Sequence, residues 1–321
     1  MERPHDLEVQ FAVIQRVSRP SVSVDEERAD RVEVIRVMPF VLLHLACLAV
    51  IWVGWSPVAL WTAVGLYGIR CFALTGGYHR YFSHRTFRLN RFWQLILAVL
   101  GNAAVQRGPM WWAAHHRYHH ANADTDADVH SPVQRGFWWS HVLWFTTIGN
   151  FPTRMDRVPD WAKYPELRFL DRFNILVPLL LLGTLYATGQ WLAAFVPGLG
   201  TNGWHMVIWG FGISTVVLYH TTFTINSLDH MIGRRPFDTP DHSRNNWVLA
   251  LLTFGEGWHN NHHRYAVSAR QGFYWWQIDL TYCGLKALSW IGIVKDLRPV
   301  PQKILAEGRG ESPPARQDTP S

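Results

Sequence analysis

Residues 37–69 read VMPFVLLHLACLAVIWVGWSPVALWTAVGLYGI and contain no Asp, Glu, Lys or Arg. About 20 apolar helical residues cross the roughly 30 Å of hydrocarbon in a bilayer, and the turn-forming Gly54-Trp55-Ser56-Pro57 divides this run into two helices near that length. A second uncharged run, residues 173–228, is divided in the same way at residues 197–203. We therefore predict four transmembrane helices in two hairpins, at about residues 37–54, 57–76, 174–196 and 204–226.

Lysine and arginine are absent from the two tight connections and frequent in residues 80–172 and 229–321. The positive-inside rule then places both termini and both polar regions in the cytosol. The predicted fold is an all-α integral membrane protein with a cytosolic helical cap, in which residues 1–36 form a polar tail, residues 37–300 the membrane domain and residues 301–321 a disordered tail. The net charge of +6 is dispersed and forms no basic stripe, so nucleic acid is excluded as a partner.

Three short motifs hold eight of the 17 histidines: HRYFSH at residues 79–84, HRYHH at residues 116–120 and HNNHH at residues 259–263. At about 3.6 residues per turn, positions i, i+3 and i+4 lie on one helical face, so each HxxHH motif points three imidazoles into one volume. Five residues of an α-helix rotate by about 140°, so His79 and His84 share a centre only where the helix ends or the ions lie between them.

So many imidazoles indicate a metal centre with two ions. Imidazole suits zinc, copper, iron and nickel, whereas a structural zinc site needs about four ligands and has no redox chemistry. The three cysteines show no CxxC spacing, and the Glu-x-x-His pairs of soluble di-iron bundles are not found at matching places. The sequence therefore favours two iron ions that activate dioxygen against an unactivated C–H bond.

The motifs resemble those of the membrane fatty acid desaturases, specifically the stearoyl-CoA type. The similar segments are GGYHRYFSHRTF (residues 76–87), WWAAHHRYHHANADTDADVHSP (111–132) and GEGWHNNHHRY (255–265), and the resemblance spans about Val37 to Gln277. A fourth match, NSLDH at residues 226–230, is the most specific. The resemblance implies Asn226, acting through water, and nine histidine ligands: His79, His84, His116, His119, His120, His230, His259, His262 and His263.

The resemblance implies an oxygen-dependent desaturase of delta-9 type that introduces a cis double bond into a saturated acyl chain, with no catalytic residue beyond the metal ligands. The acyl carrier is CoA, a phospholipid or a carrier protein, with CoA as the first choice. Because no HPGG-type haem segment is present, a separate electron donor is implied, namely a ferredoxin, a rubredoxin or cytochrome b5 with its reductase. The compact length resembles bacterial members, so we expect a multi-pass protein of the bacterial inner membrane.

Three residues are our candidates for contact with the acyl substrate: Tyr67, Arg107 and Trp112. Tyr67 aligns with the family's tunnel end, where a bulky ring shortens the accepted chain. The sequence departs from the animal acyl-CoA enzymes, because His115 replaces an acidic residue and residues 146–149 lack the basic groups that hold CoA phosphates. The nearby substitutes are Arg107, Arg154 and Arg157.

Carboxylates beside the motifs could accept the second N–H of the ligand imidazoles, and these are Asp124, Asp126, Asp128, Asp229 and Glu256. Among the other histidines, His115 and His141 could orient ligands and His130 has no assigned metal. We do not expect ligands at His5, His44, His205, His220 and His242.

Two other functions remain open from the sequence. A membrane di-iron hydroxylase of lipids or alkanes would share the fold and the ligands, although the NSLDH and GEGWHNNHH segments favour desaturation. A membrane metal-binding protein without catalysis predicts ligands at mid-span, where only His44, His205 and His220 lie, without cluster spacing.

Overall fold

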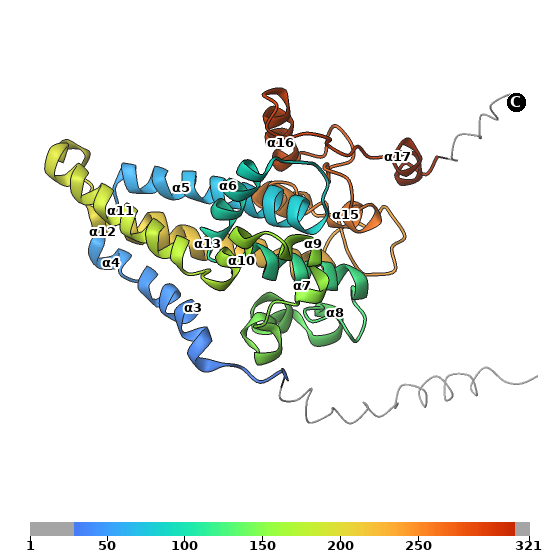
Figure 1. Cartoon of the computed structure of the whole chain (residues 1–321), viewed down its shortest axis with the longest axis horizontal. Coiled ribbons are helices and arrows are strands. Elements are labelled where there is room, and N and C mark those ends of the chain that lie inside the picture. Colours follow the sequence, from blue (N-terminus) through green and yellow to red (C-terminus); the bar gives the residue numbers. More distant parts are fainter. Residues whose placement is uncertain (1–28, 312–321) are drawn as a thin grey trace, which may run out of the picture.

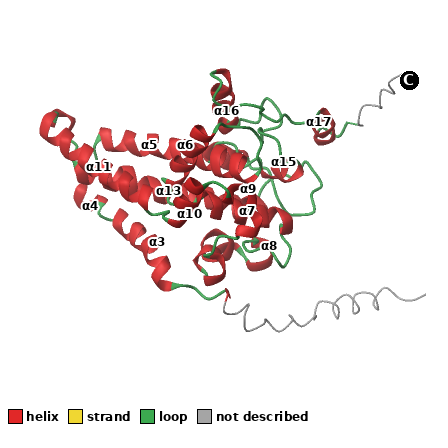
Figure 2. Cartoon of the chain, in the orientation of Figure 1, coloured by secondary structure: helices red, strands yellow, loops and turns green. Residues whose placement is uncertain are grey.

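The computed structural model describes residues 29–311, and helices joined by loops make up that range (Figure 1). The described residues contain isolated β-bridges but no β-strand, in agreement with the predicted all-α class (Figure 2). Residues 1–28, which include His5, and residues 312–321 lie outside the described range.

Four helical segments are long and apolar enough to cross a membrane, as predicted. The first is Val34–Val53, composed of α3 (Val34–Cys47) and α4 (Val50–Val53). The second is Pro57–Ser83, in which α5 (Pro57–Phe72) continues into the π-helix η1 (Ala73–Ser83). The third is α11 (Leu176–Phe195), and the fourth is Gly203–His230, composed of α12 (Gly203–His205), η7 (Met206–Ile213), α13 (Ser214–Asn226) and η8 (Leu228–His230).

Local signals explain where two of these segments begin. The Ser56 hydroxyl accepts a hydrogen bond from the backbone N–H of Ala59 at 3.1 Å, and Pro57 occupies the first helical position. The Asn202 side chain accepts hydrogen bonds from the backbone N–H groups of Trp204 and His205 at 2.9 and 3.1 Å. The predicted breaks are therefore capped helix starts.

The second and fourth segments continue past the predicted ends at 76 and 226, to Ser83 and His230. Both extensions carry predicted ligands, so the same continuous helical segments contain both the apolar residues and part of the histidine site. The shorter helices α6 (Arg91–Asn102) and α7 (Pro109–Asn122) pack around η1, and α10 (Pro165–Arg172) packs against α6 and α7, with buried side chains that include Leu74, Leu97 and Leu167. The main core therefore lies at the histidine end.

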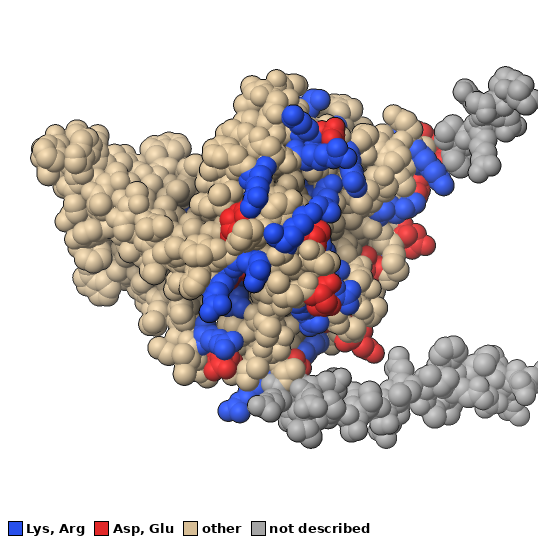
Figure 3. Space-filling model, viewed as in Figure 1, with Lys and Arg blue, Asp and Glu red and all other residues tan. Residues whose placement is uncertain are grey.

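The remaining helices of the described range are α8 (Pro132–Arg135), η2 (Trp139–Leu143), η3 (Trp144–Thr146), η4 (Ile148–Asn150), η5 (Met155–Arg157), α9 (Pro159–Ala162), η6 (Pro197–Leu199), α14 (Trp247–Leu252), α15 (His259–Arg264), α16 (Leu280–Trp290) and α17 (Gln302–Gly308). Charged side chains gather over the half that carries α6–α10 and α15–α17, whereas the end with α4, α11 and α12 is almost free of them on the face shown (Figure 3).

The C-terminal expectation is partly wrong. We expected residues 301–321 to be disordered, but residues 302–308 form α17. Ile304 and Ala306 of this helix are buried, and Ile304 packs with Phe237 and Tyr274 in a small satellite core. The apolar spacing within a short charged segment was too weak a signal to predict this contact.

Candidate metal centre and adjoining cavity

The first histidine motif lies on a π-helix rather than an α-helix. In η1 the backbone hydrogen bonds span five residues, and the N–H of His84 donates to the carbonyl of His79 at 3.2 Å. Residues five apart then lie on the same face, and the two imidazole rings are 4.9 Å apart. The α-helical rotation of about 140° was therefore the wrong geometry for HxxxxH here.

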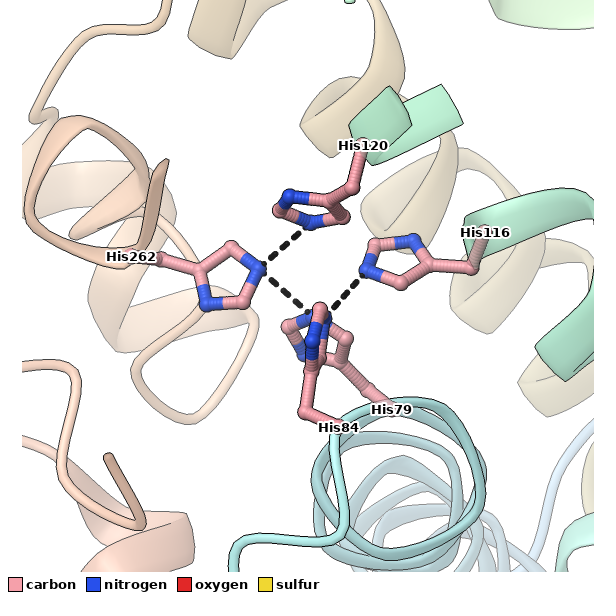
Figure 4. A group of neighbouring side chains, drawn as sticks. All are labelled: His79, His84, His116, His120 and His262. Atoms are coloured by element: carbon pink, nitrogen blue, oxygen red, sulfur yellow. Dashed lines mark hydrogen bonds between the residues drawn. The ribbon is translucent and has the colours of Figure 1, made fainter. Parts of the chain in front are cut away.

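The nine predicted histidines gather into two neighbouring groups. The five-histidine group contains His79, His84, His116, His120 and His262 (Figure 4). The four-histidine group contains His119, His230, His259 and His263.

Each HxxHH motif contributes to both groups. On α7, the i and i+4 residues His116 and His120 join the five-histidine group, while His119 joins the other. On α15 the sharing is reversed, because His262 alone joins the five-histidine group. The expectation that each motif serves a single volume was therefore wrong, although all its members converge on the same region.

Within each group, one nitrogen from every histidine lies within 4.8 Å of the others. The Nε2 atoms of His84 and His116 are 2.8 Å apart, as are those of His120 and His262 (Figure 4). Those of His79 and His262 are 3.0 Å apart. Neutral imidazoles present lone pairs on such nitrogens, and facing lone pairs repel unless a proton or a cation lies between them. The donor set therefore fits borderline transition metals such as iron.

Four of the predicted ligand histidines are oriented by buried carboxylates. The Nδ1 atoms of His119, His230 and His263 lie 2.9, 2.8 and 2.8 Å from oxygens of Asp128, Asp124 and Asp241, respectively. The Nδ1 atom of His79 likewise contacts a carboxylate oxygen of Glu256, and Glu256 also forms a salt bridge of 3.0 Å with Arg80. An Nδ1–H donated to a carboxylate fixes the tautomer that leaves Nε2 for a metal.

The predicted carboxylates have different positions. Asp124, Asp128 and Glu256 contact predicted ligand histidines. Asp126 lies on the turn between Asp124 and Asp128, and its side chain is exposed. Asp229 is buried, and its carboxylate has no hydrogen-bond partner within the described residues. Asp241 was missed, because it precedes His263 by 22 residues and no local spacing signals that contact.

Most histidines of the two groups that lie outside the candidate spans are held neutral, whereas at His119 the charge and hydrogen bond of Asp128 outweigh burial and raise the pKa. Burial, reinforced by the neighbouring histidines, keeps the pKa well below the ordinary histidine value at His84, His116, His120, His259 and His262. Burial also lowers the pKa of His263 to about 4, against the effect of Asp241. Neutral imidazole is the form that binds metal ions.

The orienting carboxylates are ionised. Burial by itself raises the pKa of Asp124, Asp128 and Asp241, but the hydrogen bonds and charges of their histidine partners outweigh burial and hold the pKa of each below its ordinary value. The site therefore combines imidazoles that are mostly neutral with fixed negative charges behind them, an arrangement that favours a bound cation.

A cavity of about 410 Å³ joins the histidines to the apolar helices. Its lining includes His79, His116 and His259 at one end and Leu43 of α3 and Leu182 of α11 further away. Asn226, the group expected to act through water, also lines it.

Two of the three predicted substrate residues line this cavity, namely Arg107 and Trp112. Tyr67 does not, because its hydroxyl donates to the carbonyl of Leu252 at 2.6 Å. The expected tunnel end at Tyr67 therefore has no support from its position.

The other histidines lie outside the two groups. His130 is buried against the ring of His119 at 4.3 Å between centroids, and His115 donates from Nδ1 to the carbonyl of Trp111 at 3.0 Å. His44, His220 and His141 form a chain, with 3.1 Å between the nitrogens of each neighbouring pair.

The fold and the site define a class of protein: helical, with apolar segments of membrane-spanning length and a histidine-rich centre at their ends. Comparison with known proteins identifies the family, since the model of the fatty acid desaturase family matches residues 53–288. The chain belongs to the fatty acid desaturase family.

Its relatives act on different acyl carriers. The chain is 38% identical to an acyl-CoA 5-desaturase of Anemone leveillei, over 82% of this chain and 78% of the relative. It is 37% identical to an sn-1 stearoyl-lipid 9-desaturase of Synechocystis sp., over 77% and 75%, and 35% identical to an sn-2 palmitoyl-lipid 9-desaturase of Nostoc sp., over 85% and 93%. The family is thus established, while the stearoyl-CoA type is not singled out.

Proposed function

We propose that this protein is an oxygen-dependent fatty acyl desaturase that introduces a cis double bond into a saturated acyl chain. One observation carries the proposal: the cavity that reaches the two histidine groups is lined largely by apolar side chains, which come from the membrane-length helices and from residues 105–112 and 144–151. A saturated chain has no polar group to recognise, so only the shape of such a cavity can select the carbons that react.

The two histidine groups would each hold one iron ion, with Asn226 acting through water. Bound iron supplies the oxidation by dioxygen that, with two electrons, removes two hydrogens from the acyl chain. The chain's own residues have three tasks. Asp124, Asp128, Asp241 and Glu256 orient ligand imidazoles, apolar walls exclude water, and Trp112 contacts the substrate beside His116.

We further propose that the four apolar segments form two transmembrane hairpins in a bacterial inner membrane, with the histidine site and both termini in the cytosol. This arrangement is supported by the many Lys and Arg residues of the polar segments and their absence from the tight connections. A separate ferredoxin, rubredoxin or cytochrome b5 would supply electrons, since the basic half in Figure 3 suits an acidic partner.

The decisive experiment expresses the wild type and His119→Ala in a bacterial host, with iron per purified chain and cellular fatty acids as readouts. We expect about two irons per chain and a new cis-monounsaturated fatty acid for the wild type, and less iron and no new product for the variant. His242→Ala is the matched control, because its side chain is exposed. Zinc in place of iron, or identical lipid profiles, would contradict the proposal, and hydroxylated fatty acids would instead identify a hydroxylase.

A further inference from the structure

The cavity of about 410 Å³, which we call the acyl cavity, lies between two of the candidate spans. Pro39, Phe40 and Leu43 of α3 line it on one side, and Pro178 and Leu182 of α11 line it on the other. No residue of α3 is buried, so this helix is not packed tightly into the bundle. In a bilayer, a space between two spanning helices is open to lipid acyl chains from the side.

Two arginines lie at the end of this cavity that carries the first residues of α3. Arg36 and Arg107 both line it, and their guanidinium carbons lie 4.8 and 4.6 Å from the centroid of one ring, that of Phe151. Arg36 comes from α3 and Arg107 from the segment before α7. Two cations from distant parts of the chain therefore converge on one point.

These two cations lack a carboxylate partner. Several arginines within residues 29–311 form salt bridges with Asp or Glu, but neither Arg36 nor Arg107 forms one. Arg107 is also held at a positive φ of 70°, which an L-residue rarely adopts and which commonly marks a functional site. Two neighbouring like charges repel, so an anion bound between them would stabilise both.

We propose that Arg36 and Arg107 bind the phosphate of a membrane glycerophospholipid, whose acyl chain enters the cavity between α3 and α11. This inference rests on the proposed function and adds the acyl carrier to it. Arginine forks bind phosphate oxygens with paired, charge-assisted hydrogen bonds.

The surroundings of the two arginines favour a lipid over CoA. The flanking side chains Ile35 of α3 and Leu179 of α11 are 76% and 55% exposed, which suits acyl neighbours and not a hydrated nucleotide. A glycerophospholipid brings one phosphate and two acyl chains, whereas CoA brings several phosphates and an adenine ring. The apolar flanks and the two cations match the lipid.

The test uses the purified, iron-loaded full chain with dioxygen, a reduced ferredoxin and three stearoyl substrates. These are distearoyl phosphatidylglycerol in vesicles, distearoylglycerol in the same vesicles and stearoyl-CoA. We expect the wild type to desaturate phosphatidylglycerol with the highest kcat/KM. For Arg36→Gln and Arg107→Gln, we expect KM for phosphatidylglycerol to rise about tenfold each, with unchanged kcat and no change for distearoylglycerol.

Arg31→Gln is the matched control, because Arg31 is exposed near Arg36 but does not line the acyl cavity. Arg107→Lys retains the charge and should recover most of the affinity if the Gln variant folds poorly. Equal KM values for wild type and both Gln variants would overturn the phosphate site, and so would a preference for stearoyl-CoA that depends on these arginines. Desaturation of none of the three substrates would instead contradict the proposed function.

Discussion

At the scale of single residues, the site depends on pairs of a histidine and a carboxylate. In each pair the carboxylate is buried, so it cannot exchange its imidazole partner for water at low cost. Asp128 shows how tightly these groups are held, because it contacts Nδ1 of His119 and also accepts the backbone N–H of Asp124 at 2.9 Å. The imidazole is thereby fixed before any metal binds.

Asp128→Asn tests this role. An amide accepts the histidine N–H more weakly and removes a negative charge, so we expect metal affinity to fall by about 10-fold to 100-fold, with the helical content retained. Metal content after dialysis against graded chelator concentrations measures the change. Asp126→Asn, two residues away and exposed, should match the wild type. Equal metal loss in both variants would show that Asp128 does not orient His119.

At the scale of elements, the π-helix η1 determines the five-histidine group. It packs so closely on α6 that a Cβ added at Gly101 would lie 2.3 Å from the ring of Tyr78. Tyr78 is fully buried and directly precedes His79. The absence of a side chain at Gly101 is therefore what permits this ring position and, with it, the direction of the His79 imidazole.

Gly101→Ala should displace the Tyr78 ring and destabilise the protein by about 1–3 kcal/mol, as overpacking of a full core does. The same change should lower the metal content, because His79 moves with Tyr78. Thermal unfolding in detergent and iron analysis provide the two measurements. Gly183→Ala on α11 is the control, since no atom lies within 4 Å of its added Cβ. A variant at residue 101 as stable and iron-rich as this control would refute the packing argument.

At the scale of the whole molecule, the charged side chains lie over one half of the face shown, and the end of the apolar helices with α4, α11 and α12 is almost free of them (Figures 1 and 3). The four candidate spans are an even number, so a chain that crosses the membrane with each of them has both ends on the same side. The proposed orientation places that side in the cytosol.

Reporter fusions test this orientation in a bacterial host. Alkaline phosphatase, which is active only outside the cytosol, should be active when fused after Gly200 and inactive when fused after Ser321 or after Gly149. Insertion of a fluorescent protein that folds in the cytosol should give the opposite pattern. Activity after Gly149 would place the histidine motifs outside the cytosol and contradict the proposed topology.

Features that depend on neighbouring residues could be predicted from the amino-acid sequence. Uncharged runs and their breaks predicted the four apolar segments, because burial in lipid needs a continuous length of helix. The nine predicted ligands converge in the structure, and six of them come from the two HxxHH motifs, each of which lies on one short helix. Family membership followed from the same motifs.

Which histidine joins which group could be seen only from the packing of the folded chain. The division of each HxxHH motif between two groups depends on how α7 and α15 face η1 and η8, and no spacing within the motif encodes it. The contact of Asp241 with His263 and the shared position of Arg36 and Arg107 on Phe151 join residues far apart in the chain. Such contacts depend on the packing of whole helices, and local periodicity carries no information about that packing.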